Sequence, residues 1–288
     1  MEADSLAVVE QELVIKDTLL NSGYDFSVYL LKQNMRKVII FGTLIVCELF
    51  ICFGFENKKE NAFDNSKGVA VIELFTSEGC SSCPPAEAVM HKLIQKANTE
   101  SLPVYILEFH VDYWDYLGWK DTFAMPMYSQ RQQGYGYHFN LKSIYTPQAI
   151  INGKCEMIGS DDDKINAELT LELQNPSSVN IDCKVHTTGN SKIVADYNIT
   201  GNIFGCELNL AVVESGLTTY IQNGENAHAT LTHDNVVRVF KRVDLKSLTG
   251  QITIAVPHIN LAHASLICFV QNNENRNIIA ATRIAITQ

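Results

Sequence analysis

Apolar and polar positions change period along the first half of the chain and predict alternating strands and helices. Residues 69–75 are almost continuously apolar, as in a buried parallel strand. Residues 84–97 carry apolar side chains at helical spacing, and residues 103–111 form a second strand-like run. Residues 120–138 are helical in places. The pattern therefore opens as strand, helix, strand, helix.

The next segment continues with a hairpin and a helix. Asn152-Gly153 lies between two short apolar runs, which is a strong hairpin signal. Residues 161–173 begin with three aspartates and predict a helix, because carboxylates favour a helix N-terminus. Asn175-Pro176 then breaks the pattern. Beyond it, alternating runs typical of a β-sandwich recur at 179–185, 192–199, 206–213, 236–243, 251–256 and 265–270.

A different pattern occupies the N-terminal part. Basic residues at 36 and 37 precede an apolar run at 38–53, and residues 35–55 are interpreted as a signal peptide or a signal anchor. The location predicted is periplasmic or secreted, with an inner-membrane anchor through residues 38–55 if the signal is retained. Residues 1–34 are either upstream of the true start at Met35 or a cytoplasmic extension.

Net charge and cysteine content limit the partners and the disulfide chemistry that the chain can be expected to have. The net charge is −10, which argues against nucleic acid as a partner because phosphate backbones require basic patches. Of the eight cysteines, Cys47 and Cys52 lie in the signal. Some of the remaining six could pair in an oxidising compartment, in a connectivity that the sequence leaves open.

Cys80 and Cys83 carry the clearest chemistry. They form a Cys-Ser-Ser-Cys motif where the first strand ends and the first helix begins. A helix N-terminus favours thiolate over thiol, so Cys80 is expected to be the exposed nucleophile and Cys83 the resolving thiol. A structural disulfide and half of a zinc site are the alternatives. With this motif, the element order predicts an α/β thioredoxin-like domain at 67–175, followed by an all-β sandwich domain at 176–288.

Two further segments are expected at the same site. Thr146-Pro147 precedes the hairpin, where a cis-proline would lie beside the sulfurs and leave the backbone free to bind an extended substrate. Residues 110–119 follow the second strand, and Asp112, Trp114 and Trp119 are candidates for a substrate-binding wall. A packing plug of aromatic side chains, or a metal site of His110, Asp112 and Asp115, remain alternatives.

Other polar residues receive structural interpretations. Arg131 is expected to be an ion-pair partner on its helix. The segments 223–226 and 232–238 are interpreted as hydrogen-bonded turns that lead into a strand, although His233 stands beside Asp234. No metal and no cofactor are assigned.

The motifs at 73–87, 110–121, 145–148 and 224–238 resemble a family of secreted bacterial proteins called domain of unknown function 1223, over residues 68–288. This resemblance implies a thioredoxin-like fold, export and a paired-cysteine site at Cys80 and Cys83, but no substrate. The sequence departs from the usual thioredoxin site by lacking a Trp before the first cysteine.

Three functions are consistent with these features. The first is an exported thiol-disulfide oxidoreductase whose partners are protein or small-molecule thiols and disulfides. The second is a non-catalytic binding or assembly protein with a structural disulfide. The third is a peroxide-responsive thiol protein.

Overall fold

The computed structural model describes residues 27, 31, 35, 68–189 and 191–286 of the chain, and residues 68–189 and 191–286 belong to one compact unit. The predicted signal or anchor at 35–55 and the extension at 1–34 lie almost wholly outside the described residues. Within the described part, no helix is long and apolar enough to span a bilayer.

The order of elements over 70–173 follows the sequence prediction. The apolar run at the start is a strand, the cysteine motif leads into a helix, and the Asn152-Gly153 hairpin and the final helix are present. Asn152 and Gly153 both have positive φ, as a tight hairpin turn requires. The elements are β1 (Ala70–Thr76), α3 (Cys83–Glu100), β2 (Val104–His110), α4 (Pro126–His138), β3 (Gln148–Ile151), β4 (Cys155–Ile158) and α5 (Asp162–Leu173).

The second half is built of strands. Those expected from alternation at 179–270 are all present, whereas β8, β9 and β13 were not predicted. The strands are β5 (Asn180–Thr187), β6 (Lys192–Thr200), β7 (Cys206–Glu214), β8 (Leu217–Tyr220), β9 (Thr230–His233), β10 (Val236–Asp244), β11 (Thr249–Ala255), β12 (Ala264–Asn272) and β13 (Ile278–Ala285).

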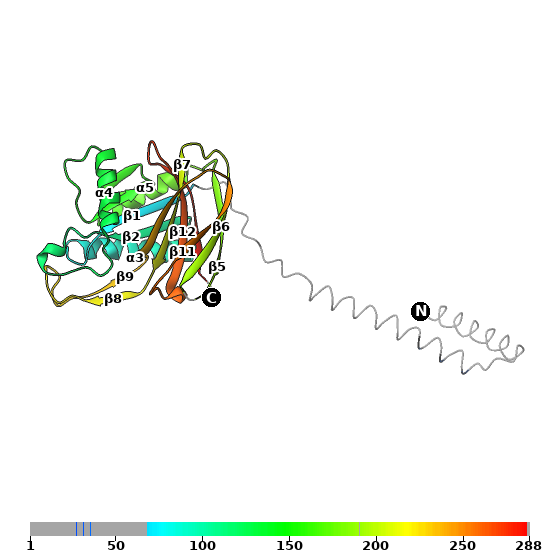
Figure 1. Ribbon diagram of the computed structural model, residues 1–288, viewed down its shortest axis with the longest axis horizontal. Helices are drawn as coiled ribbons and strands as arrows, with labels where there is room; N and C mark the ends of the chain where they lie inside the picture. Colours follow the sequence, from blue (N-terminus) through cyan, green and yellow to red (C-terminus); the bar gives the residue numbers. More distant parts are fainter. Residues whose placement is uncertain (1–26, 28–30, 32–34, 36–67, 190, 287–288) are drawn as a thin grey trace, which may run out of the picture. The chain divides into compact units, whose positions relative to one another are not determined.

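The predicted fold class, a thioredoxin-like domain followed by a separate sandwich, is wrong. Strands of both halves form one eight-stranded mixed sheet in the order β13-β12-β7-β10-β2-β1-β3-β4. Figure 1 labels β1, β2, β7 and β12 of this sheet. The joint is a parallel bridge between Val236 of β10 and Glu108 of β2. Asn235 reinforces it, because its side chain donates to the Ile106 carbonyl at 3.1 Å and its own carbonyl accepts from Glu108 N at 3.1 Å. The boundary predicted at 175/176 lies between α5 and β5 and stays a prediction.

The buried core explains why the halves are continuous. One apolar cluster combines β1, β2 and α4 of the first half with β7, β10, β12 and β13 of the second, including Phe75, Phe109, Phe240 and Phe269. A second cluster lies where α3 and α5 pack on β1 and β3. A third fills the space between the strands of the large sheet and the three-stranded sheet β11-β6-β5. Alternation of apolar residues shows that a strand is half buried but not which strand lies beside it.

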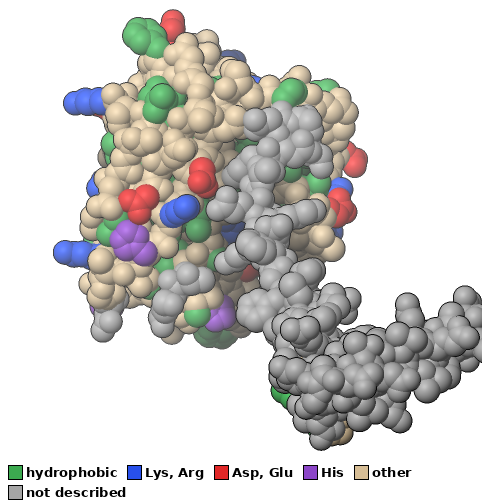
Figure 2. All heavy atoms as spheres, turned by 90° about the vertical axis from the view of Figure 1, so that its right-hand side faces the viewer, with side chains coloured by type: hydrophobic (Ala, Val, Ile, Leu, Met, Phe, Trp, Pro, Cys, Tyr) green, Lys and Arg blue, Asp and Glu red, His purple; other side chains and the backbone are tan. Residues whose placement is uncertain are grey.

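The face of the molecule shown in Figure 2 has no distinct charged or hydrophobic patch among its described side chains. On the face that Figure 2 presents, the described acidic, basic and hydrophobic side chains are interspersed rather than gathered by charge.

Candidate functional site

Cys80 and Cys83 lie where β1 passes into α3, as predicted. Cys83 is the first residue of the helix, with Pro84 and Pro85 in its first turn, where proline is well tolerated. Both thiols are free in this structure. Cys80 was expected to be exposed, and this is wrong: both cysteines are fully buried, while Ser81 and Ser82 between them are exposed.

Thr146 lies against the Cys80 sulfur. Its Oγ1 donates a hydrogen bond to Cys80 Sγ at 3.2 Å, and its carbonyl oxygen is 3.9 Å from the same sulfur. Trp114 Nε1 in turn donates to Thr146 Oγ1 at 2.7 Å, which directs the hydroxyl proton toward the sulfur. The Thr146–Pro147 bond is cis, as expected. Thus Trp114 and Thr146, which were both predicted at the site, form a chain of two hydrogen bonds that ends on the Cys80 sulfur.

The two cysteines differ in their acidity. The hydrogen bond from Cys83 lowers the pKa of Cys80 most, burial opposes it, and hydrogen bonds from Ser82 and Thr146 lower it further, to about 6. Burial and the neighbouring Cys80 raise the pKa of Cys83 well above its usual range. These opposite shifts favour the thiolate on Cys80 and the protonated thiol on Cys83.

A loop from the second half, at residues 225–226, contacts the turn at residues 78–82 that carries Cys80 (the cysteine turn). Glu225 Oε2 accepts from the Ser81 N–H at 2.9 Å and from the Ser81 hydroxyl at 2.7 Å. Asn226 Nδ2 donates to the carbonyls of Glu78 at 2.8 Å and Cys80 at 3.0 Å. These residues were interpreted as part of a hydrogen-bonded turn that leads into a strand. Their contacts show that the segment holds the backbone on either side of the reactive sulfur.

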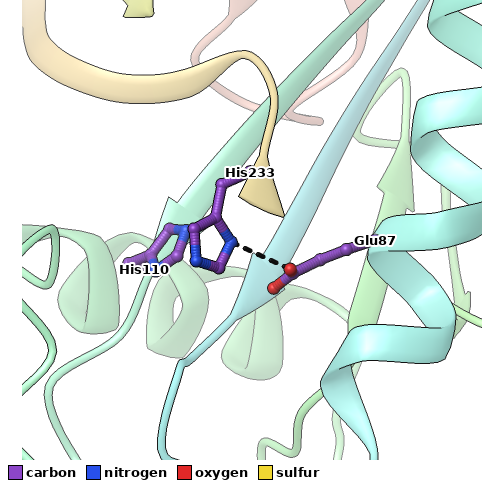
Figure 3. Close-up of side chains that lie close together, drawn as sticks. All are labelled: Glu87, His110 and His233. Carbon is purple, nitrogen blue, oxygen red and sulfur yellow. Dashed lines mark hydrogen bonds and ion pairs between the residues drawn. The ribbon is translucent and has the colours of Figure 1, made fainter. Parts of the chain in front are cut away.

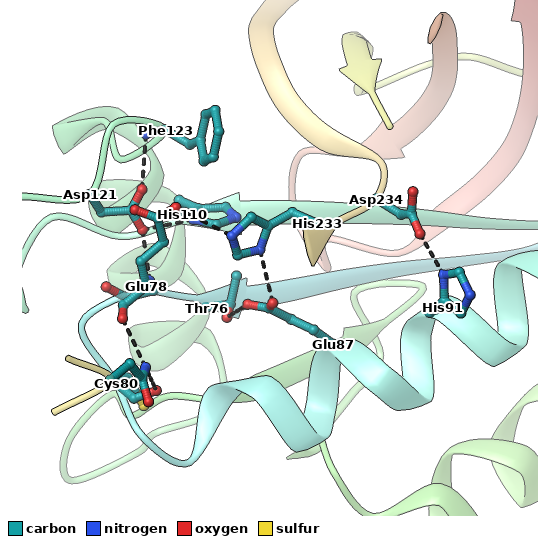
Figure 4. Close-up of polar contacts among 12 residues, drawn as sticks. Thr76, Glu78, Cys80, Glu87, His91, His110, Asp121, Phe123, His233 and Asp234 are labelled. Atoms are coloured by element: carbon teal, nitrogen blue, oxygen red, sulfur yellow. Dashed lines mark hydrogen bonds and ion pairs between the residues drawn. The ribbon is translucent and has the colours of Figure 1, made fainter. Parts of the chain in front are cut away.

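Behind the cysteines lies a buried polar cluster that the sequence did not reveal. His233 Nδ1 is 2.9 Å from Glu87 Oε2, and His233 Nε2 is 3.3 Å from Glu78 Oε1. Thr76 donates to the other oxygen of Glu87 at 2.6 Å. Although burial disfavours a charged ring, hydrogen bonds to Glu78 and Glu87 raise the pKa of His233 to about 10. His233 is therefore a buried member of the site and not only a turn residue (Figure 4).

His110 belongs to the same cluster through a partner that was not predicted. Its Nδ1 is 2.7 Å from Asp121 Oδ2, and both side chains are fully buried. Asp121 Oδ2 also accepts from the Glu78 N–H at 2.8 Å. Asp112 instead accepts from the Ser129 hydroxyl at 2.5 Å, and Asp115 accepts from the Asp121 N–H at 3.2 Å. The structure thus joins His110 to Asp121 and not to Asp112 or Asp115.

Of the remaining predicted residues, Trp119 belongs to the polar cluster, whereas Asp112 and Arg131 make structural contacts elsewhere. Trp119 Nε1 donates to Glu78 Oε2 at 2.9 Å and so closes the polar cluster. Asp112 ties the loop after β2 to α4 and makes no hydrogen bond to the cysteines. Arg131 forms a buried ion pair with Glu73 within the shared core, in agreement with its structural interpretation.

Comparison with known proteins supports a shared fold. A family model described as "Protein of unknown function (DUF1223)" matches residues 71–271. A crystal structure of a protein from Agrobacterium tumefaciens is 27% identical, with a TM-score of 0.61, and the alignment covers 77% of this chain and 96% of that one.

Other comparisons add little. A domain of the outer membrane lipoprotein Omp28 from Porphyromonas gingivalis is 16% identical over 38% of this chain and 97% of that one, with a TM-score of 0.26. This likeness is too weak to support a shared fold. None of the curated proteins matches the chain.

Proposed function

The chain belongs to the DUF1223 family, and from its site we propose that it carries out thiol-disulfide exchange, with Cys80 as nucleophile and Cys83 as resolving thiol. The observation that carries the proposal is the set of hydrogen bonds on one sulfur: Thr146 Oγ1 donates to Cys80 Sγ at 3.2 Å, and Ser82 Oγ lies 3.2 Å from it. Donors aimed at a buried sulfur stabilise its anion, which is the attacking form.

The reaction balances with two cysteines. The Cys80 thiolate attacks one sulfur of a substrate disulfide, that S–S bond breaks, and the leaving thiolate takes up a proton. Cys83 then loses its proton and attacks Cys80 in the mixed disulfide. The substrate leaves with both thiols reduced, and the protein holds a Cys80–Cys83 disulfide. The reverse sequence oxidises a dithiol substrate, and the same residues serve both directions.

The partners we propose are protein or small-molecule thiols and disulfides. Because Cys80 is fully buried, a substrate reaches it only after side chains packed around its sulfur move. Trp114 is half-buried and lies close to Gly79, since a Cβ on Gly79 would be 3.1 Å from Trp114 Cβ. The loop after β2 is therefore the part of the site that we expect to govern access.

The proposal is tested by trapping the mixed disulfide. The Cys83→Ala variant lacks the resolving thiol, so oxidised glutathione should add stably to Cys80, as identified by mass spectrometry of the peptide. Cys155 is the matched comparison within the same molecule, because it is more exposed than Cys80 but burial and Glu168 raise its pKa to about 12. We expect glutathione on Cys80 and not on Cys155.

A turnover assay provides the second arm. Reduction of insulin by dithiothreitol should be accelerated by the unmodified chain and by Cys155→Ser, and not by Cys80→Ser. Glutathione on Cys155 alone, on neither cysteine, or turnover that survives Cys80→Ser would each refute the proposal.

A further inference from the structure

We propose that Glu87, His110 and His233 form a binding site for one divalent transition-metal ion of the zinc type, an activity separate from thiol exchange. Glu87 lies on α3, His110 ends β2 and His233 ends β9, and Figure 3 shows the three side chains converging. One potential ligand atom from each lies within 4.8 Å of the other two. All three residues are buried, with His110 and His233 fully inaccessible.

His110 carries an unused nitrogen at this point. Its Nδ1 interacts with Asp121, so Nε2 is left as the free ring atom, and Nε2 is buried without any hydrogen-bond partner. The His110 and His233 rings contact each other edge to face, with centroids 5.0 Å apart. Buried polar atoms are rarely left unpaired, and a histidine held by a carboxylate through its other nitrogen is the common arrangement of a metal ligand.

The charges around the three residues also favour a cation. Glu78, Glu108 and Asp121 are buried in the same region as Glu87. Glu78 Oε1 has only His233 Nε2 beside it, at 3.3 Å, and Glu108 Oε2 has no hydrogen-bond partner. The ion pairs of the described residues bring His110 to Asp121 and His233 to Glu78 and Glu87, and bring no lysine or arginine to any of these four side chains. Several acidic side chains in a site of low dielectric require a counter-charge, and a divalent ion bound to the two rings would supply more of it than His233 does alone.

The ligand set selects the class of metal. Two imidazole nitrogens and one carboxylate oxygen suit zinc and its neighbours, whereas calcium and magnesium take oxygen ligands. Zinc bonds of about 2 Å place ligand atoms about 3.3 Å apart, so the three atoms need to close by no more than about 1.5 Å. The ion would replace the proton now shared by His233 Nδ1 and Glu87, which are already 2.9 Å apart.

Cobalt(II) and zinc binding test the site directly. The full chain with Cys80→Ser and Cys83→Ser, which removes thiolate ligands, is treated with a chelator, dialysed and titrated with Co²⁺ while visible absorption is recorded. We expect one equivalent to bind with the intense bands of a four-coordinate site, and Zn²⁺ to displace it. Absence of saturable Co²⁺ binding by this folded protein would overturn the proposal.

Single replacements assign the ligands. His110→Ala and Glu87→Gln should abolish binding, and Asp121→Asn should weaken it by about tenfold to a hundredfold, because Asp121 orients His110. His91→Ala is the control, since His91 pairs with Asp234 at 2.5 Å on the exposed side of α3, and it should bind as the parent does. If His110→Ala fails to fold by circular dichroism, Glu87→Gln and Asp121→Asn decide the assignment. Unchanged binding in folded Glu87→Gln and Asp121→Asn would contradict it.

Discussion

At Cys80, burial and hydrogen bonding act in opposite directions on one sulfur. Burial disfavours the thiolate, while donors from Cys83, Ser82 and Thr146 favour it, and the donors prevail. The motif and Thr146 could be predicted because each carries a local signal. Asn226 and His233 could not, because they reach the site from more than 140 residues away in the sequence.

The rate of alkylation of Cys80 should follow this balance. For the reduced chain, the rate with iodoacetamide is expected to rise through pH 6 and to level off above pH 7, since the thiolate is the reactive form and its pKa is about 6. Cys83→Ala removes the strongest donor and should move the midpoint upward. Peptide mass spectrometry over a pH series measures both. A midpoint near pH 9 in the unmodified chain would show that the donors do not act as described.

At the scale of elements, a buried ion pair and apolar packing both hold α4 against the sheet. Arg131 pairs with Glu73 of β1 and also donates to Tyr135 at 3.2 Å and to Gln271 at 3.1 Å. Its guanidinium lies 4.7 Å from the centre of the Phe240 ring. The helix was predictable in part from residues 120–138. Its partners in β12 and β10 were not, because periodicity does not report which strands a helix covers.

Arg131→Ala should therefore be strongly destabilising. It leaves the Glu73 carboxylate buried without its counter-charge, and the loss expected is about 3–5 kcal/mol in the free energy of unfolding, measured by urea titration. Lys164→Ala serves as the comparison, because Lys164 pairs with Asp161 at an exposed site, and it should change stability little. A loss in Arg131→Ala no larger than that in Lys164→Ala would contradict a structural role for the buried pair.

At the scale of the whole molecule, the two halves share a sheet and a core. The sequence predicted the strands at 179–270 but assigned them to a separate sandwich. The bridge that joins them to the first half pairs Val236 with Glu108, 128 positions away, and no local pattern reports such a pairing. The consequence for function is direct. The second half supplies Glu225, Asn226 and His233 to the site, and the first half supplies the cysteines.

The shared core predicts one cooperative unfolding transition. Phe269 on β12 is fully buried beside Phe240, and Phe269→Ala should cost about 3–5 kcal/mol. Both tryptophans of the chain, Trp114 and Trp119, lie in the first half, so their fluorescence reports on the region of the cysteines. In Phe269→Ala, we expect the midpoints of unfolding measured by fluorescence and by circular dichroism to fall together. A fluorescence midpoint that stays unchanged would show that the halves unfold independently.

The equilibrium between the protein and glutathione tests the proposed chemistry most directly. The full chain is incubated in buffers of graded ratios of reduced to oxidised glutathione, quenched with acid, alkylated and analysed by mass spectrometry for the Cys80–Cys83 disulfide. An exchange-active pair is expected to form this disulfide reversibly, with a potential between about −120 and −300 mV. Failure to form it at any ratio, or a potential well below about −300 mV, would contradict a role in thiol-disulfide exchange.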